Sequence, residues 1–412
     1  MLARVALAAI IASALIAEGS PVAAAPVAHT RVVSADPIDS TPHVLDGIVN
    51  AIAVVGRTVV VGGAFSEVTD AARTTVLPRD NLFAFDLRTG RILPGFTPVV
   101  TGPVHALAAG ERGTVYAGGE FHGVNGARSR ALARLRLSDG ALVRGFAPRV
   151  IGGSVTALAR QGGHLYVGGD FIGPREALAR LDATTGAADP RFDITPGGPL
   201  TSSVKVYALA VSRGRLAVDG SFTTLDGHSR PQLGLIDVGG AVARVAPWRT
   251  AAYARKCASA FPSYVRGLDF SPDGGHFVVV TTGGARGGMC DTAARFETYA
   301  KGSGIRPTWV NATGGDSLYA VAVTGAAVYV GGHQRWLNNP KGRDSAGPGA
   351  VSRPGIGAIH PHTGKALTWN PTRERGIGVK AFSAHGSGLL VGSDTTRLGR
   401  EYHARIGMFP LP

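Results

Sequence analysis

The stretch Val155-Thr-Ala-Leu, followed by Leu165-Tyr-Val-Gly-Gly-Asp-Phe171, is one copy of a phrase that recurs along the chain. It joins a short apolar segment to a strand-like run that usually closes on Gly-Gly. The copies begin at Val49, Val104, Val155, Val206, Val265, Leu318 and Val379. Successive copies start 51 to 61 positions apart. A period near fifty residues with strand-like composition is typical of β-propeller blades.

Each copy divides into four strand-like pieces. The apolar start and the Gly-Gly run are the first two, and residues 177–181 illustrate the third. A tight turn such as Thr184-Thr-Gly186 follows, where glycine accepts a positive φ. The fourth piece carries one aromatic residue in six copies, namely Phe96, Phe146, Phe192, Trp248, Trp309 and Trp369. We therefore predict an all-β, seven-bladed β-propeller with four-stranded antiparallel blades, forming a single domain over residues 26–412.

The two ends of the repeat array predict how the ring closes. The seventh copy contains its third piece, residues 403–409, but no fourth piece before residue 412. Residues 30–37 lie before the first copy. In the other blades, the fourth piece of one blade stands at this place before the next copy. We expect this N-terminal strand to complete the last blade, because closure removes open sheet edges that promote aggregation.

Residues 1–25 have the pattern of a signal peptide. Arg4 precedes an apolar run over residues 5–17, and small residues at 22–24 suit cleavage. The run is shorter than the roughly 20 residues that span a bilayer. No cysteine stands nearby for lipid attachment. We predict a secreted, extracellular protein with no transmembrane helix; an uncleaved anchor is the alternative.

The two cysteines of the chain, Cys257 and Cys290, are 33 positions apart. A pair of cysteines in an exported chain favours a disulfide. A reactive thiol or a metal pair is the alternative, but neither CxxC nor His-rich spacing supports it. We predict the disulfide, no metal and no cofactor. Asp344 and Asp394 could offer oxygens to Ca²⁺, although no EF-hand-like spacing supports such a site.

The formal net charge is +14, with 42 Lys and Arg residues against 28 Asp and Glu. A basic exported protein can meet carbohydrate or an anionic wall polymer. The cations are scattered, however, so a compositional preference for arginine explains the charge equally well. No basic stripe alternates with stacking aromatics, which argues against nucleic acid as a partner. We expect a monomer.

Equivalent positions in the repeat predict two rings at one mouth of the central channel. The second residue of each copy forms an inner ring, namely Asn50, His105, Thr156, Tyr207, Arg266, Tyr319 and Lys380. Polar residues after Gly-Gly form a wider ring, and they include Glu120, Asp170, His333 and Asp394. Arg335 and Trp336 add a cation and an aromatic plate suited to a sugar or carboxylate. The alternative is structural: these groups satisfy neighbouring backbone, as expected for Glu120 and Asp170 beside loop N–H groups.

The copies and their turns also resemble a known family. The Gly-Gly-acid-Phe phrase with Asp-x-x-Thr-Gly turns resembles the delta-sixty-repeat β-propellers. In the second half, Cys290-Asp-Thr-Ala-Ala-Arg-Phe296 and Val328-Tyr-Val-Gly-Gly-His-Gln-Arg-Trp-Leu-Asn-Asn-Pro340 are similar to an exported bacterial subgroup. The resemblance covers residues 45–412 and implies a propeller and export. It supplies no reaction and no catalytic residues.

No GxSxG, Walker or HExxH motif is present. We therefore predict an exported, non-catalytic propeller that binds an extracellular or wall-associated ligand at the channel mouth. One alternative is a polysaccharide hydrolase or lyase that uses Glu120 with Asp170, or His333 with Asp394. The other is an interaction platform for a second exported protein.

Overall fold

The computed structural model describes residues 27–150, 152–173, 175–284 and 287–412, and the predicted signal peptide lies outside these residues. The regular structure of the described residues consists of β-strands, without a helix. Every strand pairing is antiparallel, and each of the large sheets is built from consecutive segments of the chain. The described chain is therefore an all-β protein of locally assembled sheets.

Seven of the described sheets contain three long strands, in the order innermost, middle and outer. The innermost strands are β2 (Ile48–Val55), β7 (Val104–Ala109), β12 (Val155–Gln161), β16 (Val206–Ser212), β22 (Val265–Phe270), β26 (Leu318–Val323) and β31 (Ala381–His385). The middle strands are β3 (Thr58–Ala64), β8 (Thr114–Gly119), β13 (His164–Gly169), β17 (Arg215–Gly220), β23 (His276–Thr281), β27 (Val328–Gly332) and β32 (Gly388–Gly392). The outer strands are β6 (Leu82–Asp86), β11 (Leu132–Arg136), β14 (Leu178–Asp182), β20 (Leu233–Asp237), β24 (Thr292–Glu297), β30 (Ile356–Ile359) and β35 (Ile406–Pro410).

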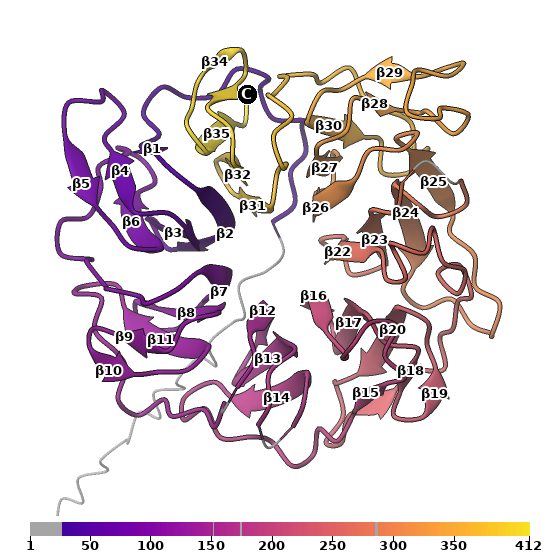
Figure 1. Ribbon diagram of the computed structural model, residues 1–412, viewed down its shortest axis with the longest axis horizontal. Coiled ribbons are helices and arrows are strands. Elements are labelled where there is room, and N and C mark those ends of the chain that lie inside the picture. The colour runs from indigo at the N-terminus through magenta and orange to yellow at the C-terminus, as the bar shows by residue number, and fades with distance from the viewer. Residues whose placement is uncertain (1–26, 151, 174, 285–286) are drawn as a thin grey trace, which may run out of the picture.

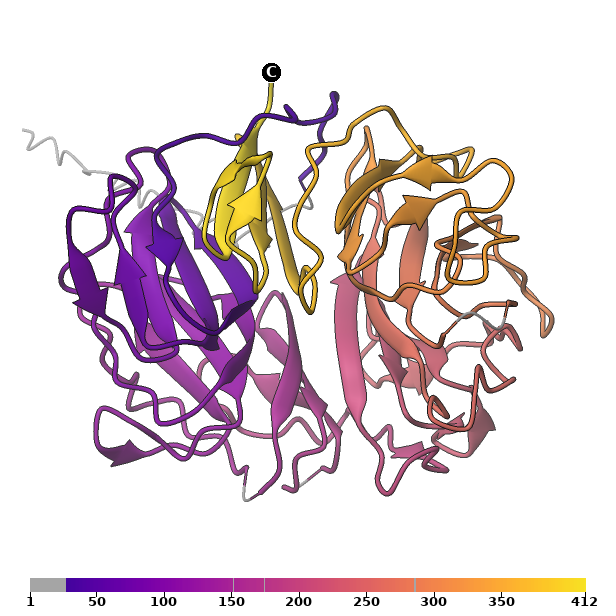
Figure 2. The same cartoon turned by 45° about the horizontal axis from the view of Figure 1, so that its top comes forward.

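The sheets stand around a common axis (Figure 1). Each innermost strand contacts the innermost strand of the next sheet, and β31 contacts β2, so the circuit returns to its start. In the described part of the chain no sheet closes on itself, and packing between neighbouring sheets joins them. Figure 2 shows the same sheets from a tilted direction, with the yellow C-terminal sheet between the indigo and orange ends of the circuit.

The Gly-Gly pairs explain how closely neighbouring sheets approach. A Cβ atom on Gly62 would lie 2.6 Å from Cγ1 of Val104 in the next sheet, and one on Gly118 would lie 2.4 Å from Cγ1 of Val155. The same contact joins the last sheet to the first, because a Cβ atom on Gly392 would lie 2.5 Å from Cγ1 of Val49. The first glycine of the phrase thus makes room for the β-branched residue that opens the next copy.

The predicted fourth strand is regular in only two of these sheets. β21 (Arg244–Val245) pairs with β20, and β25 (Trp309–Ala312) pairs with β24. Four other sheets have a single bridge at that place, for example between Phe85 and Ile92. The chain turns directly after the bridge, and its aromatic residue enters the space between two sheets, where Phe96 packs with Val115. A few backbone hydrogen bonds at the bridge, together with the burial of that ring, hold the fourth piece.

The predicted N-terminal strand lies where expected but is not a regular strand. The Ser34 N–H donates to the Pro410 carbonyl at 2.8 Å, and the Ile38 N–H donates to the Met408 carbonyl at 2.9 Å. The indole N–H of Trp369 donates to the Ser34 carbonyl at 2.9 Å. These bonds place residues 34–38 along the outer edge of β35, beside the yellow sheet in Figure 1.

Short strands lie in the connections between middle and outer strands, and two more, β1 and β15, lie before an innermost strand. β1 (His43–Val44), β4 (Glu67–Thr69) and β5 (Val76–Pro78) form one small sheet. The others pair as β9 (Gly123–Val124) with β10 (Ala127–Arg128), β15 (Pro196–Gly197) with β18 (Thr224–Leu225) and β19 (His228–Ser229), β28 (Trp336–Leu337) with β29 (Val351–Ser352), and β33 (Arg397–Leu398) with β34 (Glu401–Tyr402). These hairpins carry polar loops around the ring.

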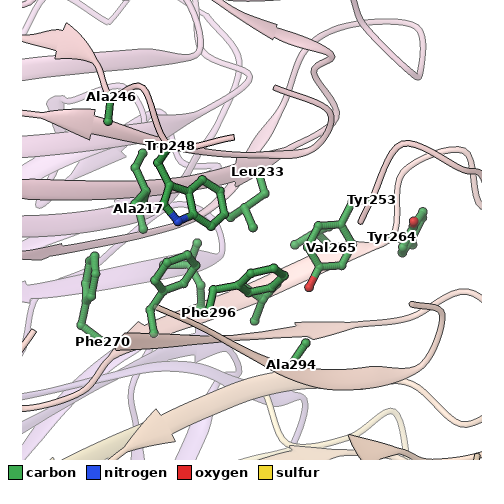
Figure 3. Close-up of a cluster of buried hydrophobic side chains, with 14 of the residues drawn as sticks. Ala217, Leu233, Ala246, Trp248, Tyr253, Tyr264, Val265, Phe270, Ala294 and Phe296 are labelled. Atoms are coloured by element: carbon green, nitrogen blue, oxygen red, sulfur yellow. The ribbon is translucent and has the colours of Figure 1, made fainter. Parts of the chain in front are cut away.

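The largest aromatic cluster lies between the β16 and β22 sheets (Figure 3). Trp248 packs edge-on against Phe296 with 5.6 Å between ring centroids, and its indole N–H donates to the Glu297 carbonyl. Burial of such a side chain contributes about 2–3 kcal/mol. Cys257 belongs to this cluster and forms the disulfide with Cys290, which confirms the predicted bridge. The bridge ties the segment before β22 to the loop after β23.

Candidate functional site

A repeated β-bulge presents the inner-ring residues. In six sheets the pairing of innermost and middle strands shifts between the first and third residues of the copy, so the second residue has no opposite partner. The unpaired residues are Asn50, His105, Thr156, Tyr207, Arg266 and Tyr319. In the seventh sheet Lys380 precedes β31, and its N–H donates to the Gly392 carbonyl. A bulge re-aims its side chain out of the regular pleat.

The innermost strands line a central cavity of about 260 Å³. Six of the inner-ring residues contribute to its wall, namely Asn50, Thr156, Tyr207, Arg266, Tyr319 and Lys380. The rest of the wall consists of apolar residues from the same strands, such as Ile52 and Leu158. His105 does not belong to this lining, although Ala106 and Leu107 beside it do. The fold thus brings most of the predicted inner ring to one opening.

Two cations of the cavity lie on tyrosine rings. The Lys380 Nζ atom is 3.5 Å from the centroid of the Tyr319 ring, and the Arg266 Cζ atom is 4.6 Å from that of Tyr207. All four side chains are half-buried. The Arg266 guanidinium donates to the carbonyls of Val265 and Ser263. Among the described residues, neither cation forms an ion pair with a carboxylate. Their positive charge remains available to a ligand.

Burial also affects the charge of this pair. Burial lowers the pKa of Lys380 to about 8, and the positive charge of Arg266 lowers it in the same direction. The Asp394 carboxylate opposes this shift. Lys380 is therefore protonated at neutral pH, and an incoming anion would stabilise that charged form.

Asn50 and Thr156 join neighbouring sheets. The Asn50 side-chain amide donates to the Val104 carbonyl at 3.3 Å, and the Thr156 hydroxyl donates to the Val206 carbonyl at 2.5 Å. Each acceptor belongs to the innermost strand of the next sheet. The structural interpretation of the ring therefore accounts for these two residues.

Asp170 is held by several hydrogen bonds, whereas Glu120 is largely exposed to solvent. Asp170 accepts hydrogen bonds from the N–H and hydroxyl of Ser154, and Lys205 Nζ lies 3.3 Å from its carboxylate. Burial raises the pKa of Asp170, but these bonds outweigh it and the pKa is lowered. Glu120 is mostly exposed and lies 3.9 Å from His105 Nε2, while burial lowers the pKa of that imidazole.

His333 and Asp394 bind the same loop rather than each other. The His333 Nε2 atom accepts from the Ser317 N–H, and its Nδ1 atom lies 3.4 Å from the Ile377 carbonyl. Asp394 accepts from the N–H groups of Ile377 and Gly378. Both groups therefore hold the chain that leads into β31.

Arg335 and Trp336 contact each other beside the ring. The Arg335 guanidinium lies 4.3 Å from the centroid of the Trp336 ring and makes two bonds to the buried Asp316 carboxylate, at 2.9 and 3.0 Å. Arg335 also pairs with Asp344, and Arg375 donates to Asp316 at 3.0 Å. The arginine covers one face of the indole, so this pair serves the loop more than a ligand.

Sequence reasoning missed Lys205, Ser154 and Ser317, which hold the wider ring. Each stands one position before a copy of the phrase, so this position of the repeat could have been recognised in the sequence as a site of polar residues. It also missed Asp316 and Arg375, whose contact spans 59 positions of sequence. No repeat position marks these two residues.

The carboxyl groups with raised pKa values lie outside the cavity wall. Burial raises the pKa of Asp219 to about 8 and the pKa values of Asp269 and Asp291 to about 7. A glycosidase needs such a carboxyl group beside its substrate. None of the three lines the central cavity.

Comparisons with known proteins give one family match and similar solved structures. Residues 113–142 match the model of a family described as a domain of unknown function (DUF5122) beta-propeller. A computationally designed protein, Ika8, is similar with a TM-score of 0.50 and 15% identity, over 90% of this chain and 98% of that chain. The WD40 β-propeller domain of Doa1 gives a TM-score of 0.48 and 13% identity, over 86% and 94%. The search of curated proteins gives no match.

The circuit of sheets gives the described residues a β-propeller fold, and the family match over residues 113–142 agrees with it. This fold is suited to binding and interaction. In the part of the chain that the structure describes, no helix has the length and hydropathy needed to cross a bilayer.

Proposed function

We propose that this β-propeller is an exported, non-catalytic protein whose central cavity binds an anionic carbohydrate, such as a uronic-acid polymer or an anionic wall polymer. The proposal takes the seven large sheets as seven blades and residues 30–37 as the segment that completes the last one. The main observation behind the proposal is the pair of cations that lie on tyrosine rings, Lys380 on Tyr319 and Arg266 on Tyr207.

The chemistry of this pair suits a charged sugar. Cations without carboxylate partners attract an anion, and their partial burial strengthens the interaction relative to open water. One face of each half-buried tyrosine ring is covered by its cation, so the tyrosines would contribute their hydroxyl groups as hydrogen-bonding partners of a sugar. Export is supported by the predicted signal peptide, and the disulfide is compatible with an oxidising compartment.

A binding titration tests this proposal. We expect oligogalacturonate to bind the wild-type protein more tightly than a neutral glucan oligosaccharide of equal length, by calorimetry at low salt. Lys380→Met and Arg266→Gln should each weaken binding by about tenfold or more, because charged hydrogen bonds contribute about 1.5–3 kcal/mol. Lys365→Met is the matched control, since Lys365 is an exposed lysine outside the cavity lining. Equal affinity for both sugars, or unchanged affinity in both cavity variants, would contradict the proposal.

The pH dependence has a defined sign. Lys380 carries its charge below its pKa of about 8 and loses it above. Affinity for the anionic oligosaccharide should therefore fall as pH rises from 7 to 9.5, and the Lys380→Met variant should lack this decline. If affinity declined equally in the variant, the pH dependence would belong to a group other than Lys380.

The hydrolase or lyase alternative receives less support from the site. Asp170 and Asp394 are engaged by loop N–H groups, and His333 does not contact Asp394 within the described residues. Incubation with pooled polysaccharides should release no reducing ends. Release that disappears in Glu120→Gln would replace the non-catalytic proposal with the enzymatic one.

A further inference from the structure

Three potential metal ligands meet where the N-terminal segment joins the last sheet. The carboxylates of Asp39 and Glu401 and the imidazole of His403 each offer an atom, and these atoms all lie within 4.8 Å of one another. The His403 Nε2 atom is 3.6 Å from the Glu401 carboxylate. This group lies at the outer edge of the ring and shares no residue with the central cavity.

The imidazole of His403 is buried, with only 3% of the residue exposed. Among the described residues neither ring nitrogen has a partner at hydrogen-bonding distance, and the Glu401 carboxylate, 3.6 Å from Nε2, is too far for a normal hydrogen bond. A buried polar atom without a partner costs about 1–3 kcal/mol, so such atoms are rare and call for an explanation. The His403 ring also faces that of His43, with centroids 6.0 Å apart, and His43 in turn contacts the Tyr402 ring. Aromatic side chains thus wall one side of the group.

The backbone fixes these ligands from two ends of the chain. Asp39 follows Ile38, whose N–H is bonded to β35, and it precedes β1. Glu401 lies in β34, and the N–H of His403 donates to the Thr396 carbonyl at 2.8 Å. The turn before β34 packs closely on the N-terminal segment, since a Cβ atom on Gly399 would lie 2.4 Å from Pro37 Cδ. The three ligands are therefore held near one another before any ion arrives.

We propose that Asp39, Glu401 and His403 form a binding site for a first-row divalent transition cation such as Zn²⁺, which fastens the N-terminal segment to the last sheet. One imidazole with two carboxylates is a donor set that Zn²⁺ accepts, whereas Ca²⁺ and Mg²⁺ prefer oxygen ligands alone. Zn²⁺ bonds of about 2.0–2.2 Å place tetrahedral ligand atoms about 3.3–3.6 Å apart. Small rotations of the exposed Asp39 and Glu401 carboxylates would reach that spacing. Such an ion would partner the buried imidazole.

The test uses the full chain after chelator treatment and dialysis. Titration with Zn²⁺ should show one saturable site with a dissociation constant below about 10 μM, and Zn²⁺ should raise the melting temperature. Asp39→Asn and Glu401→Gln should each weaken Zn²⁺ binding about tenfold or more and abolish the rise. Asp36→Asn is the matched control: it removes a neighbouring charge from the same segment and should change affinity less than threefold.

Several outcomes would overturn the proposal. These are the absence of saturable Zn²⁺ binding up to 1 mM, unchanged binding in both carboxylate variants, or tighter binding of Ca²⁺ or Mg²⁺ than of Zn²⁺. His403→Ala removes the buried ligand but can also disturb packing, so the two exposed carboxylate variants decide. Zn²⁺ should also protect the bonds around residues 36–42 from limited proteolysis in the wild type and not in Glu401→Gln. Sugar binding at the central cavity is independent of each result.

Discussion

Asp219 stands where five of the other six copies of the phrase have their first glycine, and its carboxyl group is fully buried in β17. One oxygen accepts the Ala208 N–H at 2.9 Å, and the other has no hydrogen-bonding partner within the described residues. Burial raises its pKa from 3.8 to about 8, despite the opposing effects of the Ala208 bond and the Arg266 charge. The folded protein thus holds this group protonated at neutral pH, while the unfolded chain ionises it.

The sign of the effect follows from proton uptake. Between pH 4 and pH 8 the folded state binds one more proton than the unfolded state, so stability falls as pH rises through this window. The slope is about 1.4 kcal/mol per pH unit for one proton. From pH 4 to pH 7, Asp219 should therefore reduce the free energy of unfolding by about 4 kcal/mol.

Asp219→Asn should remove this dependence. The asparagine can still accept the Ala208 N–H, but it does not titrate. Urea denaturation followed by tryptophan fluorescence should give similar stabilities for both proteins at pH 4. At pH 7 the variant should be more stable by about 4 kcal/mol, because it avoids the cost of holding a proton.

The difference in unfolding free energy between the two proteins at each pH reports on Asp219 alone, because all other titrating groups are common to both. Asp226→Asn, in an exposed turn, is the control and should follow the wild type at every pH. Parallel stability curves for the wild type and Asp219→Asn would show that Asp219 is ionised in the folded protein, and would refute the reasoning from burial.

Three further predictions concern the assembly of the ring. Gly118→Ala should destabilise by about 1–3 kcal/mol in urea, because its methyl group would overlap the next sheet, whereas Gly145→Ala has open space and should be neutral; equal effects would refute the proposed packing role. Removing the Cys257–Cys290 bridge by a double Cys→Ala change should cost about 3–4 kcal/mol, measured as a lower urea midpoint; an unchanged midpoint would contradict this value. Deleting residues 28–38 should lower the melting temperature of the whole protein, and an unchanged value would count against closure by this segment.

The repeat made most of the architecture readable in advance. The phrase placed the innermost and middle strands at the observed positions, and the disulfide was predicted from export and cysteine number. The sequence analysis predicted more regular fourth strands than the structure contains. An aromatic residue such as Phe96 gives the same sequence pattern in a paired strand as in a segment that turns inward after one bridge. Pairing depends on the neighbouring sheet, which the local pattern does not contain.

The site was only partly readable. Equivalent repeat positions identified Tyr207, Arg266, Tyr319 and Lys380, and the fold brings all four to one cavity. Their pairing into two cation–tyrosine contacts was not predicted, because it depends on the side-chain directions of adjacent sheets. The structural role of Asp394 was likewise not predictable, because its carboxylate accepts hydrogen bonds from the loop before β31, which lies beside it only in the folded protein.

The sequence alone determined the period, the strand class and the glycines that let sheets approach, because each of these is a local property of spacing and side-chain size. Only the tertiary structure decided which polar groups lack a partner. His403 and Asp39 are separated by almost the whole chain, and the circuit of sheets brings them together. Whether a group is satisfied depends on every atom around it, and those atoms come from segments that no local pattern connects.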